Sequence, residues 1–173
     1  MSNGTASLSV LVNEKVVCIK IAGRANFQAS IDFKTLVNAL WTKGRTRFVL
    51  ELSDCQLMDS TFLGVLAGLG IRFNQVRNGE VPAILELLNA SARILNLIEN
   101  LGISHLFQMH EGAAPAVSEL KSVEKTADTP DRAETTRICL DAHRLLMEIN
   151  PDNVSKFKDV ARFLEEDLKK LEG

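Results

Sequence analysis

Residues 48–70, read as FVLELSDCQLMDSTFLGVLAGLG, decide the fold of this chain. The stretch begins with apolar residues typical of a buried strand and ends with apolar residues at helical spacing. The turn between them holds Asp59, Ser60 and Thr61. A hydroxyl in the first turn of a helix lies beside unpaired backbone N–H groups, which favour negative charge. A phosphate on Ser60 or Thr61 would add about −1.5 to −2 charge there.

The same turn has a second interpretation. Asp, Ser and Thr are the residues that most often cap a helix start, and capping alone is the more common reason for finding them there. The pattern by itself therefore leaves two hypotheses open, a simple helix cap and a regulated hydroxyl. The rest of the chain is needed to weigh them.

Composition favours one soluble domain with room for an appendage. The chain has 173 residues, of which 46% are hydrophobic and 24% are charged. Its formal net charge of −2 and the lack of a basic cluster argue against nucleic-acid binding. No apolar run approaches the ~18 residues of a membrane span. Residues 1–9 lack the features of a signal peptide, so we expect a cytoplasmic protein. Three widely separated cysteines, an odd number, are interpreted as reduced thiols (Cys18, Cys55 and Cys139).

Apolar patterning predicts strands that alternate with helices. The predicted strands cover residues 8–12, 16–22, 47–52, 83–88 and 106–109. The predicted helices cover residues 30–41, with Ser30 as cap, and 61–77, 91–101 and 117–123. This order predicts an α/β sandwich with a mixed, mostly parallel sheet of about five strands covered by helices. The first two strands should form an antiparallel pair.

The last third of the chain has a different pattern. Residues 125–134 are polar and are interpreted as a linker, within which Thr129 could cap a helix and Pro130 could begin it. Residues 135–173 carry two apolar stripes joined by a short turn at residues 150–152, which predicts an antiparallel α-helical hairpin. Such stripes must pack on each other, on the first domain, on a second copy in a homodimer, or on another protein.

Residues 8–124 resemble the STAS domain, the fold of bacterial anti-sigma factor antagonists. The sequence VVCIKIAGR at residues 16–24 is similar to the family's second strand. The segments FVLELS at 48–53 and MDSTFLG at 58–64 resemble its signature strand and phosphorylation loop. Residues 83–109 resemble the last strand, helix and short strand of the family.

The resemblance implies a phosphorylation switch. In the family, the hydroxyl residue directly after the loop aspartate receives phosphate from an anti-sigma factor serine kinase, and a phosphatase removes it. Here that residue is Ser60, with Thr61 as second choice. The chain departs from the family by carrying Phe62 where glycine is usual, which we expect to add apolar surface beside the acceptor. The residues expected to bind a partner are Asp59, Ser60, Thr61, Phe62, Arg24 and Asn26.

We expect no enzyme, cofactor or metal site. No nucleophile, base and orienting residue stand in a recognisable pattern, and the spacing of His105, His110 and His143 matches no metal motif. These histidines are interpreted as solvated or hydrogen-bonded. Two alternative functions remain: an unphosphorylated STAS accessory subunit docked on an ABC-transporter ATPase, or a ligand-sensing STAS domain.

Overall fold

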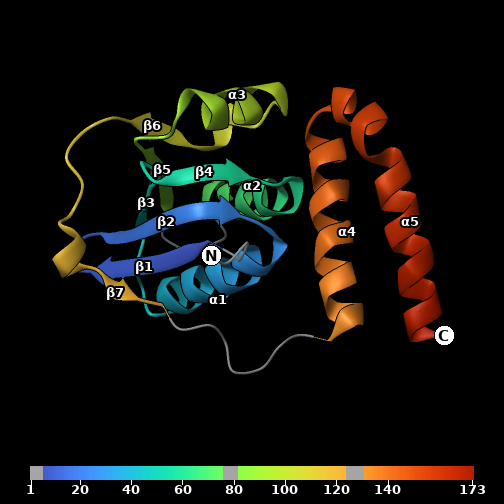
Figure 1. Ribbon diagram of the computed structural model, residues 1–173, viewed down its shortest axis with the longest axis horizontal. Helices are drawn as coiled ribbons and strands as arrows, with labels where there is room; N and C mark the ends of the chain where they lie inside the picture. The colour runs from blue at the N-terminus through green and yellow to red at the C-terminus, as the bar shows by residue number, and fades with distance from the viewer. Residues whose placement is uncertain (1–5, 76–81, 124–130) are drawn as a thin grey trace.

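The computed structural model describes residues 6–75, 82–123 and 131–173 (Figure 1). Its strands are β1 (Ser7–Val12), β2 (Val17–Ala25), β3 (Arg47–Glu51), β4 (Cys55–Met58), β5 (Ile84–Leu88), β6 (Gln108–His110) and β7 (Lys121–Ser122). Its α-helices are α1 (Phe27–Thr42), α2 (Ser60–Asn74), α3 (Ala92–Asn100), α4 (Arg132–Ile149) and α5 (Val154–Glu172). Short 3₁₀ helices are η1 (Ser104–Leu106), η2 (Val117–Glu119) and η3 (Pro151–Asn153).

The predicted α/β fold with a mostly parallel sheet is confirmed. The strand order is β6-β5-β3-β2-β1-β7, and β4 also pairs with β2. The pairs β2–β3, β3–β5 and β5–β6 are parallel, while β1 is antiparallel to β2 as expected. The described residues form seven strands where about five were predicted, because β4 and β7 were not recognised in the sequence.

The core lies on one face of this sheet. Alternate residues of β2, Val17 and Ile19, stand beside Phe48 and Leu50 of β3, and all four side chains are fully buried. Phe33 of α1 belongs to the same cluster, with further side chains from α2 and α3. Because side chains alternate across a strand, the same pattern sends every second residue to the opposite face.

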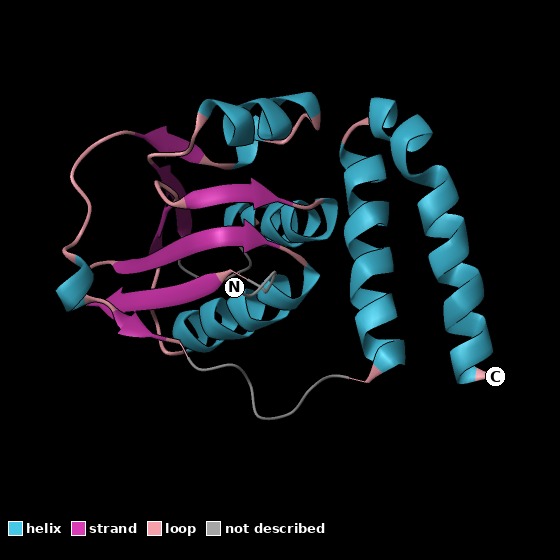
Figure 2. Cartoon of the chain, in the orientation of Figure 1, coloured by secondary structure: helices cyan, strands magenta, loops and turns pink. Residues whose placement is uncertain are grey.

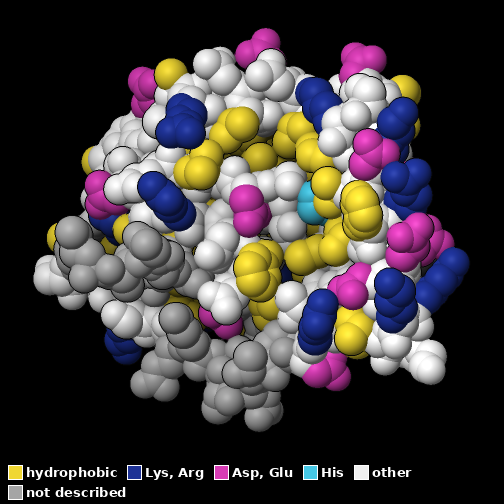
Figure 3. Space-filling model, turned by 45° about the vertical axis from the view of Figure 1, so that its right-hand side comes forward, with side chains coloured by type: hydrophobic (Ala, Val, Ile, Leu, Met, Phe, Trp, Pro, Cys, Tyr) yellow, Lys and Arg dark blue, Asp and Glu magenta, His cyan; other side chains and the backbone are white. Residues whose placement is uncertain are grey.

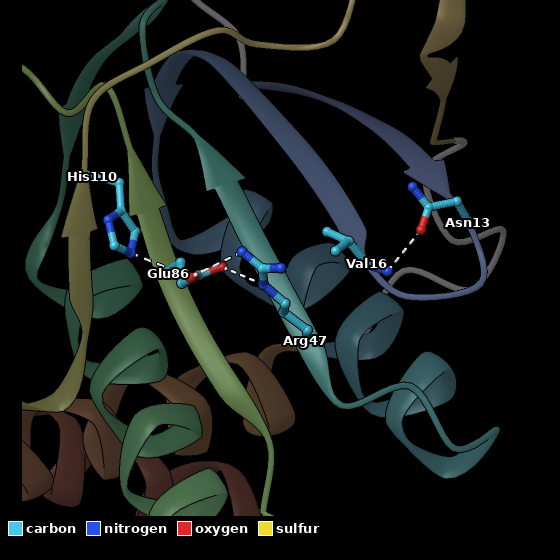
Figure 4. A network of polar contacts seen from close by, with 5 residues as sticks. All are labelled: Asn13, Val16, Arg47, Glu86 and His110. Atoms are coloured by element: carbon cyan, nitrogen blue, oxygen red, sulfur yellow. Dashed lines mark hydrogen bonds and ion pairs between the residues drawn. The ribbon is translucent and has the colours of Figure 1, made fainter.

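The opposite face holds buried charge. Glu86 on β5 accepts hydrogen bonds from Arg47 on β3 and lies 3.2 Å from His110 on β6 (Figure 4). Glu51 is fully buried and accepts from the backbone N–H of Ser53 at 2.8 Å. These partners satisfy the carboxylates, so this face is held by polar contacts between neighbouring strands.

Two helix predictions were wrong. Helix α1 begins at Phe27, and its cap is Asn26, whose Oδ1 accepts from the backbone N–H of Ala29. The predicted cap, Ser30, lies within the first turn and donates instead to the carbonyl of Phe27. The helix expected at residues 117–123 is replaced by η2 and β7, because Lys121 and Ser122 pair with the free edge of β1.

Helix α2 ends earlier than predicted, at Asn74 instead of residue 77. Residues 76 and 77, the end of the predicted range, lie outside the described residues. The same is true of Thr129 and Pro130. In the described chain, α4 begins after the cap Asp131, so it includes the last residues of the range predicted as linker.

The C-terminal helices form a hairpin beside the rest of the molecule. In Figure 2, α4 lies between α5 and the α/β portion. Among the apolar residues of α5, four are buried or half-buried (Phe157, Ala161, Leu164 and Leu168), whereas Val154, Val160 and Leu171 are exposed. No helix of the described ranges has the length and apolar character needed to cross a membrane.

The turn of the hairpin is fixed to the end of α3. Asn153 is fully buried, and its Nδ2 donates to the carbonyls of Leu101 and Leu146 at 2.9 and 2.8 Å. Lys156 donates to the carbonyl of Asn100 at 3.2 Å. Carbonyls at a helix C-terminus lack partners within the helix, so these donors stabilise both α3 and the turn.

Candidate functional site

The candidate site forms where β2 and β4 end side by side. Ala25 on β2 pairs with Met58 on β4, and the backbone N–H of Asp59 donates to the carbonyl of Ala25 at 2.9 Å. Helices α1 and α2 begin directly after these strands. The exposed Arg24 and the half-buried cap Asn26 therefore lie close to the Asp59 turn.

Asp59 caps α2. Its Oδ1 accepts from the backbone N–H of Phe62 at 2.8 Å. Burial raises the pKa of the Asp59 carboxyl, whereas hydrogen bonds from the N–H groups of Phe62 and Phe27 act in the opposite direction. The carboxylate thus joins the starts of two helices, and the capping interpretation of this residue is correct.

Ser60 is partly buried and touches a residue 83 positions later in the chain. Its Oγ lies 2.8 Å from Nε2 of His143 on α4. The other ring nitrogen, Nδ1, lies 2.6 Å from the carbonyl oxygen of Cys139. A carbonyl oxygen only accepts, so Nδ1 carries a proton, and in the neutral ring Nε2 accepts the proton of the Ser60 hydroxyl.

The expectation that Phe62 adds apolar surface beside the acceptor was wrong. Its side chain is fully buried, and its ring lies 5.3 Å from that of Phe33. Phe62 lies in the first turn of α2, on the side of the helix that faces the core. Thr61 is 6% exposed, and its hydroxyl bonds with the thiol of Cys139, whose pKa is raised by burial. Of the two hydroxyls, Ser60 is therefore the more accessible.

Helix α4 packs closely over the first half of α2. A Cβ atom added at Gly64 would lie only 2.6 Å from both the Cβ and the carbonyl oxygen of Ala142. One turn later, a Cβ at Gly68 would lie 3.2 Å from Cδ2 of Leu145. These two glycines therefore accommodate α4.

His143 was interpreted as solvated or hydrogen-bonded, and the second description is correct. It is 5% exposed, and its ring meets that of Phe157 edge-on at 5.2 Å. Nothing in the sequence indicated its contact with Ser60. The sequence showed only that His143 directly follows Ala142, which lies on the apolar stripe of α4.

The junction between α2 and α4 is also hollowed. In Figure 3, hydrophobic side chains gather where the hairpin meets the rest of the molecule, and a histidine lies among them. A groove of about 220 Å³ runs along the junction, with Lys34, Arg72 and Asp141 among its lining residues. Within the described ranges, no group of three or more His, Cys, Asp or Glu side chains is placed to hold a metal ion.

Comparison with known proteins gives a family match. The family model of the STAS domain matches residues 7–116. Similar solved structures include the anti-sigma factor antagonist SpoIIAA in its unphosphorylated form, at 18% identity and a TM-score of 0.48, covering 63% of this chain and 90% of that one. The Bacillus cell fate determinant SpoIIAA in its phosphorylated form is similar at 17% identity and a TM-score of 0.47, covering 62% of this chain and 92% of that one. The overall structure of SLC26A9 is similar at 14% identity and a TM-score of 0.43, covering 88% of this chain and 26% of that one. No curated protein matches the chain.

Proposed function

Since this chain belongs to the STAS domain family, we propose that it is an anti-sigma factor antagonist-like interaction module switched by phosphorylation of Ser60. The observation that carries the proposal is the position of this hydroxyl. Ser60 directly follows the cap Asp59 at the β4–α2 junction and is partly exposed, while the neighbouring Thr61 is buried. Arg24 and Asn26, on the adjacent end of β2, extend the same surface.

The switch works through charge. Unmodified Ser60 offers a small neutral hydroxyl to a partner, which we take to be an anti-sigma factor with serine kinase activity. Phosphate at Ser60 stands beside the Asp59 carboxylate, so it adds like-charge repulsion and a desolvation cost to any partner contact. The phosphorylated chain releases the partner, and a phosphatase restores binding.

In this proposal the chain does no chemistry itself. The Ser60 and His143 pair has the geometry in which an imidazole accepts a hydroxyl proton. The second ring nitrogen, Nδ1, faces the backbone carbonyl of Cys139, and the Phe157 ring packs against the imidazole. The pair is thus held by its neighbours, and in this proposal it serves to fix α4 against α2.

Phosphate mapping tests the proposal. The chain is incubated with ATP and the anti-sigma kinase encoded nearest to its gene, and the modified residue is located by mass spectrometry. We expect phosphate on Ser60, none on Ser60→Ala, and normal modification of Thr61→Val. Phosphate found only at Thr61, or none with a kinase active on another substrate, would contradict the proposal. Binding to a transport ATPase that Ser60→Asp leaves unchanged would favour the static-subunit alternative.

A further inference from the structure

The geometry points to an additional role for the C-terminal hairpin: we propose that α4 is a removable cover of the Ser60 surface. Docking of α4 and occupation of that surface by a phosphate or a partner are then mutually exclusive. This inference rests on the proposed function, because it names how access to the same residue is regulated. The hairpin lies outside the residues matched by the family model, which end at residue 116.

The first contact that carries the inference is the hydrogen bond of Ser60. Its Oγ is 2.8 Å from Nε2 of His143, so the ring occupies the space into which a group attached to Oγ would extend. The ring itself is fixed, because Nδ1 faces the carbonyl of Cys139 and Phe157 packs against its side. A phosphate on Ser60 must therefore displace His143, and His143 moves with α4.

The second contact is the close approach at Gly64. Backbone atoms of Ala142, not only its methyl group, come within 2.8 Å of the position that a Cβ at Gly64 would take. This closeness leaves no room for a third segment between α2 and α4. A partner that binds the first half of α2 must therefore take the place of α4.

The third argument is electrostatic. The half-buried Asp59 carboxylate adjoins Ser60, and burial already raises its pKa. A phosphate enclosed beneath α4 would add charge of the same sign to this partly desolvated position. Moving α4 away returns both anions to water, so phosphorylation favours the open arrangement.

The contact also indicates which partner the uncovered surface fits. The surface now binds an amphipathic helix with a small residue over Gly64 and a hydrogen-bonding side chain at Ser60. We therefore infer that the partner presents a helix of the same character, so that α4 acts as an internal competitor. The hydrogen bonds of Asn153 to the end of α3 do not involve this surface and can keep the turn of the hairpin in place.

The test places phosphoserine at position 60 during translation and follows amide hydrogen exchange in residues 132–149 of the full chain. We expect exchange in α4 to accelerate about tenfold or more, while β3 and β5 keep the protection of the unmodified chain. Phosphoserine at the exposed Ser122 on β7 is the matched control and should leave α4 unchanged. A second pair, Ser60→Asp and Ser60→Asn, differs mainly in charge, and only the aspartate should accelerate exchange.

Slower or unchanged exchange in α4 with phosphoserine at position 60 would overturn the inference, since it would mean that the phosphate is accommodated beneath α4 or bound by His143. Equal acceleration in the Ser122 control would overturn it as well. The result is independent of any kinase. If phosphate mapping fails at Ser60 but phosphoserine there still releases α4, the proposed function is wrong and the cover is correct.

Discussion

The α/β portion and the C-terminal hairpin are stabilised in different ways. The α/β portion encloses a continuous core in which Ile19, Leu50 and Phe62 are fully buried. The outer helix of the hairpin leaves Phe163 64% exposed, and α4 and α5 are joined by exposed ion pairs such as Arg144 with Glu165 at 3.5 Å. Exposed pairs of this kind contribute little stability. The first part is therefore stable through its own packing, whereas the hairpin is attached through one face of α4, where Leu146 joins the core, and through the contacts at Gly64, Ser60 and Asn153.

The largest expected effect tests the closest of these contacts. Gly64→Ala places a methyl group against the backbone of Ala142, which cannot move without α4. Overpacking of this kind costs about 1–3 kcal/mol, while alanine is the better helix former within α2. We expect hydrogen exchange in residues 132–149 to accelerate strongly and exchange in β3 and β5 to remain slow.

Gly68→Ala is the matched control for this variant. The added methyl group there meets only the flexible end of the Leu145 side chain at 3.2 Å, so α4 should stay docked. Equal release of α4 by both substitutions would show that the hairpin is sensitive to any change of α2. If amide exchange in β3 and β5 also accelerated in Gly64→Ala, the two regions would not differ in how they are stabilised.

The two regions also differ in what the sequence could predict. The strands at residues 16–22 and 47–52 were recognised because buried strands have alternating or continuous apolar residues. Strand β4 was missed because it has four residues and an exposed Gln56, and β7 because it is defined only by pairing with the edge of β1. Local patterns do not contain such long-range pairings.

The candidate site shows the same limit. The local pattern offered Asp59 as a cap, as one of two open interpretations, and the family resemblance named Ser60 ahead of Thr61. Phe62 was misplaced because the turn does not reveal which side of α2 faces the core. The contact between Ser60 and His143 joins residues that are 83 positions apart, so only the packing of α4 on α2 could reveal it.

A smaller effect is expected at the turn of the hairpin. Asn153→Leu roughly keeps the size of the side chain but removes the Nδ2 donors to the carbonyls of Leu101 and Leu146. Leaving a buried polar group without its partner costs about 1–3 kcal/mol. Exchange at residues 150–160 should accelerate, whereas α2 and the sheet should be unaffected. Unchanged protection of the turn would show that the α2–α4 contact alone holds the hairpin.

The smallest expected effect concerns Asp59, which lies where the two regions meet. Burial raises its pKa in the folded chain above the value of an unfolded aspartate, so the ionised carboxylate destabilises the fold at neutral pH relative to acid pH. Asparagine caps a helix about as well as aspartate and cannot ionise. Asp59→Asn should therefore be slightly more stable than the parent chain at pH 7, by less than the ~1 kcal/mol that loss of a cap costs.

This advantage of Asp59→Asn should disappear as the pH falls below the unfolded pKa of aspartate, where the parent carboxyl is protonated in both states. Urea unfolding of the two chains at several pH values measures the difference directly. Asp59→Ala is the control, since it also removes the charge but loses the cap to the N–H of Phe62, and it should be destabilised at every pH. A chain with Asp59→Asn that is less stable than the parent at pH 7 would mean that the attraction between the carboxylate and the two helix starts outweighs its burial. In that case a second anion at Ser60 would also meet a more favourable environment, and the electrostatic argument for release of α4 would be weakened.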